Sequence, residues 1–184
     1  MAKAMKITAA GSCLVTLLFA LLYCGCRGGA LLTLAITFGT IAYHFCIRLL
    51  IGLIFSKTMR NKADYTKKWF QLGRAEKRLY DLLKVKAWKN RMPTYDGSLF
   101  DAKKHSWDEI AQATCQAELV HETIIIFSFL PIAASVQVGA LPVFIITSVC
   151  AALFDSVFVI MQRYNRPRIV RMAERQNKKD ISQK

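Results

Sequence analysis

Four long apolar stretches constrain the fold of this chain more than any other feature of its sequence. They cover residues 7–26, 30–55, 119–137 and 141–161, and charged residues are rare inside them. A helix needs about 20 mostly apolar residues to cross a bilayer core of about 30 Å. Spanning segments must satisfy their own backbone hydrogen bonds, so helices are the expected form. The sequence therefore predicts an all-α integral membrane bundle of four transmembrane helices, folded as a single membrane domain over residues 1–184.

The first apolar stretch also has features of a secretory signal peptide, because Lys3 and Lys6 precede it. It is longer than a typical signal core of about 7–15 residues. Tyr23, which precedes Cys24, is bulky where lipoprotein processing needs a small residue. The second stretch follows directly after Gly29. We therefore expect a tight transmembrane hairpin rather than a cleaved signal.

The positions of the basic residues predict the orientation. The chain has a formal net charge of +14, and its lysines and arginines concentrate in residues 1–6, 56–118 and 162–184. The other two connections are short and carry Arg27 as their only basic residue. Because lysine and arginine favour the cytoplasmic side, we expect both termini, the interfacial segment 56–118 and the basic tail 162–184 to be cytoplasmic.

The segment 56–118 is expected to form cytoplasmic amphipathic helices at the membrane interface. In residues 56–89, tryptophan, tyrosine and leucine recur among lysines and arginines, which suits the headgroup region. Pro93 is expected to end this part, and residues 95–98 to form a turn. Residues 106–109 (SWDE) resemble a capping box, which predicts a second helix that continues into the third span.

The six cysteines indicate neither a disulfide framework nor a metal site. Most lie in the apolar stretches, where cysteine behaves as a small hydrophobe, and no CxxC or Cys/His spacing is present. A strained bridge between Cys24 and Cys26 stays open. The sequence has no P-loop and no GxGxxG motif. We expect no metal, no cofactor and no nucleic-acid partner.

Ionisable residues gather where the interfacial segment meets the third span. Glu118, His121 and Glu122 lie at i, i+3 and i+4, so they share one helix face. Glu118 can orient the ring of His121 while His121 takes a proton from a hydroxyl. Ionisable groups in membrane helices are functional hypotheses by default, whereas the simpler interpretation is an interfacial cluster that faces water.

Three more ionisable residues lie inside the predicted spans. His44 and Arg48 are one turn apart in the second span, and Asp155 lies in the fourth. Arg48 can extend to the interface, but Asp155 is too deep to do so and needs a partner, for which Arg48 and His44 are the candidates. A bundle that buries such a set usually does so around a polar cavity.

A dense cluster of hydrogen-bond donors follows the fourth span in residues 162–168, which read QRYNRPR. Arginine forks suit phosphate and carboxylate groups. A purely topogenic signal needs only positive charge and no Tyr164, Asn165 or Pro167. We therefore expect this cluster to bind an anionic head group at the membrane surface.

Three motifs in matching order resemble the glycosyl-4,4'-diaponeurosporenoate acyltransferase family of bacterial membrane proteins. They are QRYNRPR at residues 162–168, KVKAWK at 84–89 followed by Pro93 and Gly97, and TCQAELVH at 114–121. The heptapeptide is the most specific of the three, and the resemblance covers residues 79–172. The chain departs from the family pattern at Glu122, where a tryptophan is expected, and at Asp155, where a neutral amide is expected.

The resemblance implies transfer of a long-chain fatty acyl group onto a hydroxyl of a lipid or glycolipid, a carotenoid glycoside in the family's staphyloxanthin-type pathway. It implies a multi-pass protein of the bacterial cell membrane whose partners are membrane lipids, an acyl donor such as acyl-CoA, and a lipid-linked acceptor. We expect His121, Glu118 and Asn165 to be catalytic, with Asn165 or Tyr164 donating to the oxyanion. The expected substrate-binding residues are Arg163, Tyr164, Arg166, Arg168, Lys86, Trp88, Lys89, Asp155, His44 and Arg48.

Two other classes of function stay open. A small membrane methyltransferase or reductase would need a nucleotide-cofactor pocket, and the sequence has no glycine-rich segment for one. A non-catalytic scaffold or transporter that holds anionic lipid would need the net positive charge but not His121 and Glu118.

Overall fold

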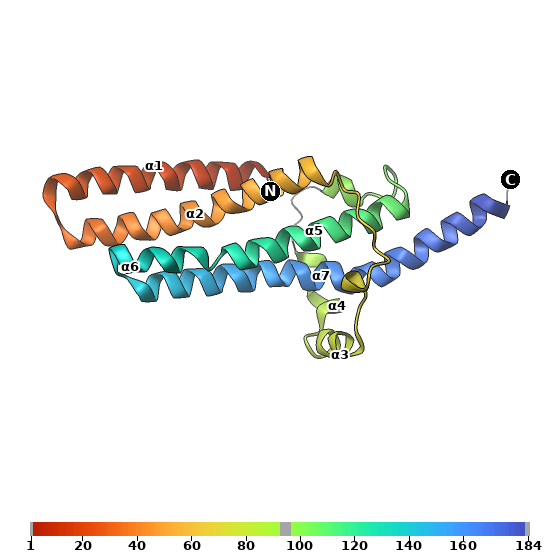
Figure 1. The fold of residues 1–184 in the computed structure, drawn as a ribbon. Coiled ribbons are helices and arrows are strands. Elements are labelled where there is room, and N and C mark those ends of the chain that lie inside the picture. Colours follow the sequence, from red (N-terminus) through yellow and green to blue (C-terminus); the bar gives the residue numbers. More distant parts are fainter. Residues whose placement is uncertain (1, 93–96, 183–184) are drawn as a thin grey trace. The chain divides into compact units, whose positions relative to one another are not determined.

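The computed structural model describes residues 2–92 and 97–182, and the described part is helical with no strand. Four helical segments are long and apolar enough to cross a membrane. They are α1 (Ala2–Cys26), α2 (Gly29–Thr58), a third segment that combines α5 (Trp107–Phe127), η4 (Leu130–Ala134) and α6 (Ser135–Val138), and α7 (Leu141–Ser182) (Figure 1). The predicted all-α class with four membrane-crossing segments is confirmed.

The chain divides into two compact units, and the division does not follow a linker. Unit 1 comprises Met1–Leu53 and Thr123–Asp155, and unit 2 comprises Ile54–Glu122 and Ser156–Lys184. Unit 1 therefore holds most of the apolar stretches. Unit 2 holds the interfacial segment and the basic tail.

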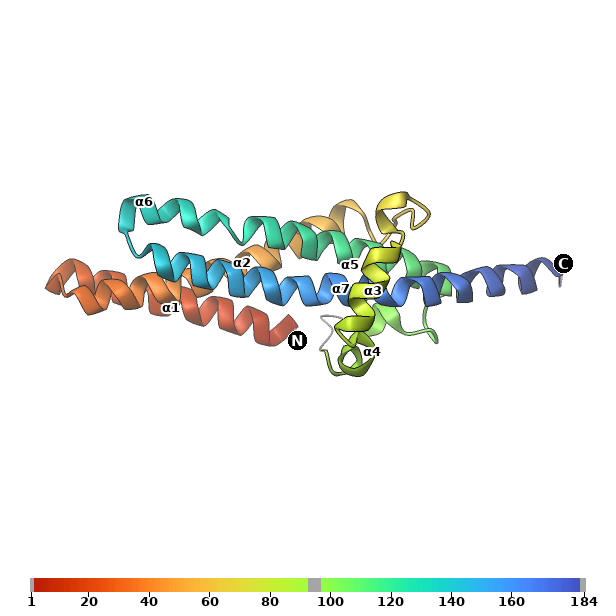
Figure 2. The ribbon, with the colours of Figure 1, turned by 90° about the horizontal axis from the view of Figure 1, so that it is seen from below.

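In unit 1, α1 and α2 form the tight hairpin that the sequence predicts, and they lie side by side in Figures 1 and 2. The chain reverses at Arg27, whose backbone is left-handed (φ 51°). The rings of Phe19 and Phe38 stack with centroids 5.9 Å apart. Gly39 of α2 lies close to α1, because a Cβ at this position would lie 3.4 Å from the side chain of Thr16. Small residues thus allow close helix approach, as in other membrane hairpins. All six cysteines are free thiols.

The third span is not one continuous helix, in contrast to the expectation for residues 119–137. α5 ends at Phe127, and η4 contains Pro131 in its first turn. Proline has no N–H, and its ring clashes with the preceding turn, so the helix breaks there. The Phe127 carbonyl, which a residue-131 N–H would bind in an unbroken helix, instead accepts a hydrogen bond of 2.8 Å from the hydroxyl of Tyr43.

In unit 2, the interfacial segment forms several short helices. They are η1 (Lys68–Phe70), α3 (Arg74–Leu82), α4 (Val85–Trp88), η2 (Lys89–Arg91) and η3 (Gly97–Phe100). Lys84 has a left-handed backbone (φ 49°) and separates α3 from α4. Figure 2 shows α3 crossing the part of α7 that belongs to this unit. Pro93 and the first two residues of the predicted turn at residues 95–98 lie outside the described residues.

The predicted capping box at the start of α5 is confirmed. The Glu109 N–H donates to the Ser106 hydroxyl at 3.2 Å, and the Ser106 N–H donates to the Glu109 carboxylate at 2.9 Å. These bonds satisfy two backbone donors that the first turn of a helix leaves without partners. The helix then continues from Trp107 to Phe127, as the sequence predicts.

The cytoplasmic orientation stays a prediction, which cysteine labelling can check. In a variant without native cysteines, a cysteine at the exposed position 103 should react with an impermeant thiol reagent only after the membrane is opened. A cysteine at position 28, in the α1–α2 turn, should react in intact cells. The reverse pattern would contradict the predicted orientation.

Candidate functional site

The buried carboxylate of Glu118 is the centre of unit 2. Glu118 is completely buried, and it forms ion pairs with Arg163 of α7 and with Arg166, which is 2% exposed. A buried charge is costly unless it is paired and hydrogen-bonded. Arg163 donates a hydrogen bond to Oε1 of Glu118, and Arg166 forms an ion pair with Oε2, so each carboxylate oxygen has a guanidinium partner. We call Glu118, Arg163 and Arg166 the arginine clamp.

Arg166 uses its remaining donors on neighbouring protein groups. Its Nε donates to the hydroxyl of Thr114 at 3.0 Å, and its Nη2 donates to the Thr114 carbonyl at 3.0 Å. Its Nη1 donates to the Phe70 carbonyl at 3.1 Å, and the guanidinium lies 5.1 Å from the centroid of the Phe70 ring. Arg166 therefore joins α5, η1 and α7.

Arg163 holds the segment between η1 and α3. Its Nη1 donates to the Trp69 carbonyl at 2.9 Å, and its Nη2 donates to the Gln71 carbonyl at 3.3 Å. Its Nε lies 2.8 Å from the carboxylate of Glu76. Burial by itself raises the pKa of Glu76, but hydrogen bonds from Arg163 and from the Gly73 N–H outweigh it and hold this pKa below its usual value. Glu76 is therefore an ionised partner of the clamp at neutral pH.

The clamp changes how the three arginines of the heptapeptide are interpreted. Arg163 and Arg166 point into the protein, where backbone carbonyls and carboxylates use their donors. Arg168 is exposed, and among the described residues it forms no hydrogen bond or ion pair. Contact of all three arginines with an anionic head group stays a prediction, and Arg168 is the one of the three whose donors are not used by described protein groups.

A pocket of about 390 Å³ lies in unit 2, and one of its lining residues is Thr114, which accepts hydrogen bonds from Arg166 of the clamp. Its polar lining includes Lys89, Gln162, Asn165 and Arg168, and its apolar lining includes Ile110, Met161, Ile169 and Met172. Ligand sites usually span about 300–1,000 Å³, so this volume suits a small ligand or one part of a larger one. We call it the basic pocket.

Lys89 and Asn165 are paired at the wall of this pocket. Nζ of Lys89 donates to Oδ1 of Asn165 and lies 4.9 Å from the centroid of the Tyr164 ring. Because a lysine ammonium can only donate, this contact fixes the amide so that its NH₂ group is directed away from Lys89. No described residue accepts a hydrogen bond from that NH₂ group.

The pocket is electropositive. The pKa of Lys89 is lowered, first by burial and then by the like charges of Arg168 and Lys86. Lysine and arginine groups that repel one another in this way favour a bound anion, which neutralises them. Phosphate is one anion with which lysine and arginine form strong charge-assisted hydrogen bonds.

His121 lies close to the pocket without lining it. Its ring stacks on Phe158 of α7, with centroids 4.7 Å apart and planes inclined by 9°. Phe158 lies one helical turn before Met161 and Gln162, which do line the pocket. The oxygens of Glu118 contact the clamp arginines, so the orienting role of Glu118 towards His121 stays a prediction.

Trp88 stabilises the connection between two short helices. Its indole N–H donates to the Leu83 carbonyl at 3.0 Å and closes the connection between α3 and α4. A substrate-binding role for Trp88 stays a prediction.

In unit 1, Asp155 is 1% exposed and forms an ion pair with Arg48, as the sequence predicts. Arg48 also donates to the carbonyls of His44 at 2.9 Å and of Ala151 at 3.4 Å. His44, Arg48 and Asp155 thus belong to unit 1, whereas the expected catalytic residues belong to unit 2. A substrate role for these three residues stays a prediction.

Sequence reasoning missed Glu76 and Thr114 as partners of the clamp. Both contact arginines that are far away along the chain, so no local motif indicates the pairing. The one local signal was the spacing of Gly73 and Glu76, which is typical of a helix start. In the described part of the chain, no group of three or more His, Cys, Asp or Glu residues could hold a metal ion.

Comparison with known proteins gives a family match over the segment that contains the arginine clamp and the basic pocket. Residues 61–175 match the protein family described as glycosyl-4,4'-diaponeurosporenoate acyltransferase. No curated protein and no solved structure matches the chain. The family match covers more than half of the sequence and includes the arginine clamp, the basic pocket and His121, but it leaves out α1 and α2. The chain therefore belongs to the glycosyl-4,4'-diaponeurosporenoate acyltransferase family.

Proposed function

We propose that this protein is a membrane-bound acyltransferase that moves a long-chain fatty acyl group onto a hydroxyl of a lipid-linked sugar, such as a carotenoid glycoside. Family membership supports acyl transfer and this class of acceptor. One observation in the structure carries the proposal further. The basic pocket combines cationic side chains with an apolar wall, which matches an acyl donor that has both phosphates and a hydrocarbon chain.

The proposed donor is an acyl thioester such as acyl-CoA. Arg168, Lys89 and Lys86 supply the positive charge that would meet its phosphates, and charge-assisted hydrogen bonds to phosphate are among the strongest in proteins. Ile110, Met161 and Met172 supply apolar contacts for the part of the donor next to the thioester. The volume of the pocket suits this central part of the donor, and the long chain would extend into the bilayer.

In the proposed reaction, His121 takes a proton from the acceptor hydroxyl as the oxygen attacks the thioester carbonyl. The NH₂ group of Asn165, which Lys89 holds in one orientation, donates to the oxyanion that forms. Collapse of the tetrahedral intermediate breaks the C–S bond, and the leaving thiolate takes the proton from His121. The products are the acyl ester and the free thiol, so no redox cofactor is required.

Arg168→Ala tests the pocket. Loss of one charge-assisted hydrogen bond of about 1.5–3 kcal/mol should raise the KM for acyl-CoA about 10- to 100-fold, with a smaller change in kcat. Initial rates with purified protein in lipid nanodiscs, acyl-CoA and a glycosylated lipid acceptor would measure both constants.

The matched control is Arg171→Ala. Arg171 is exposed on the same helix, and its Nε donates to the Pro167 carbonyl at 3.1 Å, outside the pocket. Its replacement should leave KM nearly unchanged. Equal KM values in the Arg168 and Arg171 variants would contradict donor binding in the basic pocket. An absence of any acyl transfer by the wild-type protein would favour the scaffold or transporter alternative.

A further inference from the structure

Unit 1 contains buried polar atoms that no described protein group satisfies. His44 is 6% exposed and Ser148 is completely buried. Within residues 2–92 and 97–182, both ring nitrogens of His44, the Ser148 hydroxyl and Nε of Arg48 have no hydrogen-bond partner. An unsatisfied buried polar group costs about 1–3 kcal/mol, and the hydrocarbon of a bilayer offers no water to replace the lost bond. A bound molecule would remove this cost. We call His44, Ser148 and Nε of Arg48 the buried polar cluster.

The members of this cluster lie on successive turns of two neighbouring helices. Thr40 of α2 and Phe144 of α7 line a common pocket, and farther along the same helices Arg48 donates to the Ala151 carbonyl. The two helices therefore run side by side in the same direction here. His44 and Ser148 occupy the turns between these two points of contact, next to the Arg48–Asp155 ion pair.

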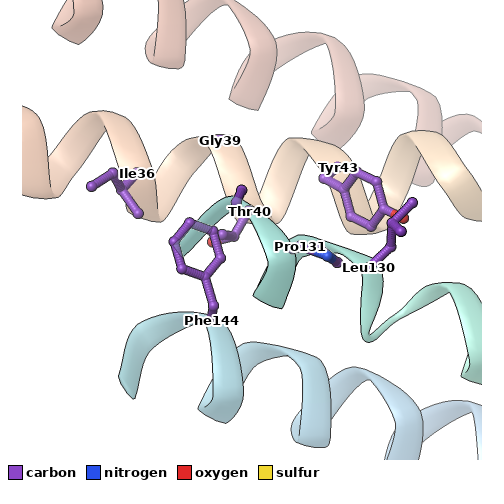
Figure 3. A pocket seen from close by; sticks show the side chains of 8 residues that line it. Ile36, Gly39, Thr40, Tyr43, Leu130, Pro131 and Phe144 are labelled. Carbon is purple, nitrogen blue, oxygen red and sulfur yellow. The ribbon is translucent and has the colours of Figure 1, made fainter. Parts of the chain in front are cut away.

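An apolar pocket of about 360 Å³ is lined by Thr40 and Phe144, which lie one helical turn before His44 and Ser148 respectively. Figure 3 shows its lining, which comes from α2 (Ile36, Gly39, Thr40, Tyr43), from the η4 segment (Leu130, Pro131) and from α7 (Phe144). Its two hydroxyl groups are already used, since Thr40 donates to the Thr37 carbonyl and Tyr43 donates to the Phe127 carbonyl, both at 2.8 Å. The pocket thus offers hydrocarbon contact, and the adjoining turn offers unused polar groups.

We propose that unit 1 binds a lipid with one hydrocarbon chain and a terminal hydroxyl group, with the chain in the apolar pocket and the hydroxyl in the buried polar cluster. A neutral histidine provides one donor and one acceptor, and a serine hydroxyl provides both, so a group that donates and accepts matches the cluster. A charged head group does not match it, because Asp155 already neutralises Arg48. This inference goes beyond the proposed acyl transfer and does not rest on it.

Photolabelling tests the proposal on the full chain in nanodiscs. The probe is a 16-carbon fatty alcohol with a diazirine in its chain, and the matched probe is the same chain without the hydroxyl. The alcohol should label peptides that contain residues 36–43 and 130–134, and unlabelled fatty alcohol should compete. Ser148→Ala should lower labelling by the alcohol about 2- to 10-fold, since one hydrogen bond contributes about 0.5–1.5 kcal/mol. Labelling by the hydrocarbon probe should not change.

Two matched controls separate the site from general effects. Thr147→Ala removes a hydroxyl that is already bonded to the Val143 carbonyl at 2.8 Å, so labelling should be retained. Ala134→Phe fills the pocket and should abolish labelling by both probes, whereas Ala133→Phe, on an exposed residue outside the pocket lining, should not. Equal labelling of the Ser148 and Thr147 variants would mean that the cluster holds only water, and the proposal would be wrong. Labelling that survives Ala134→Phe would equally overturn it.

Discussion

Replacement of His121 by alanine should lower the turnover of acyl transfer about 10²- to 10⁴-fold, which is the usual contribution of a general base. The expectation rests on the place of His121 at the start of the third span, one helical turn of α7 from the basic pocket. Initial rates per folded molecule, measured together with the melting temperature, would test it. A role in packing alone predicts a lower melting temperature with turnover intact.

His121→Phe sharpens this test, because it keeps an aromatic ring against Phe158 and removes only the ring nitrogens. It should lose turnover as the alanine variant does, with less loss of stability. His105→Ala is the control, since His105 also belongs to unit 2 and pairs with the exposed Glu109. Near-normal turnover in both His121 variants would rule out a catalytic role for this residue.

The Glu118→Gln variant should be the least stable single variant of unit 2. The change leaves the buried guanidinium groups of Arg163 and Arg166 without their shared carboxylate, and the loss of one partner from a buried ion pair typically costs about 3–5 kcal/mol. For a chain of this size, 1 kcal/mol corresponds to about 2–4 °C, so the melting temperature should fall by roughly 6–20 °C.

Glu122→Gln is the matched control on the same helix. Glu122 accepts one hydrogen bond of 3.1 Å from the exposed Trp69, so its replacement should cost only about 1 kcal/mol. If Glu118→Gln is not recovered from membranes, Arg163→Lys provides a milder test, since an ammonium cannot reproduce the fork that joins Glu76 and Glu118. Equal melting temperatures for the two glutamine variants would contradict the clamp as the centre of unit 2.

The sequence predicted the features that depend on a single physical requirement, such as hydropathy, the pairing of one buried charge or a local hydrogen-bond pattern. Length and hydropathy fixed the four spans, because only apolar helices are stable in hydrocarbon. The depth of Asp155 required a cationic partner, and Arg48 is that partner. Residues 106–109 predicted the start of α5 because a capping box is a purely local interaction.

The sequence did not predict which arginines are buried, since that depends on segments far apart in the chain. Phosphate binding was predicted for Arg163, Arg166 and Arg168 from residue type, whereas in the structure Arg163 donates to the carbonyls of Trp69 and Gln71 and pairs with the carboxylate of Glu76. The helical spacing of the three arginines does indicate which of them share a face of α7. Arg163 and Arg166 are three residues apart and share a face, whereas Arg168 lies two residues beyond Arg166 and faces another direction.

The hydrogen bond from Tyr43 to the Phe127 carbonyl also has a consequence for how the third apolar segment enters a membrane. Chains are synthesised from the N-terminus, so the hairpin of α1 and α2 leaves the ribosome before the segment that contains Pro131. The donor for the carbonyl at the helix break is therefore already in the membrane when that segment enters. A shortened chain that began at residue 61 would lack this donor and would bring a bare carbonyl into hydrocarbon, at a cost of several kcal/mol. We therefore expect the hairpin, which the family match leaves out, to help the segment around Pro131 insert into a membrane.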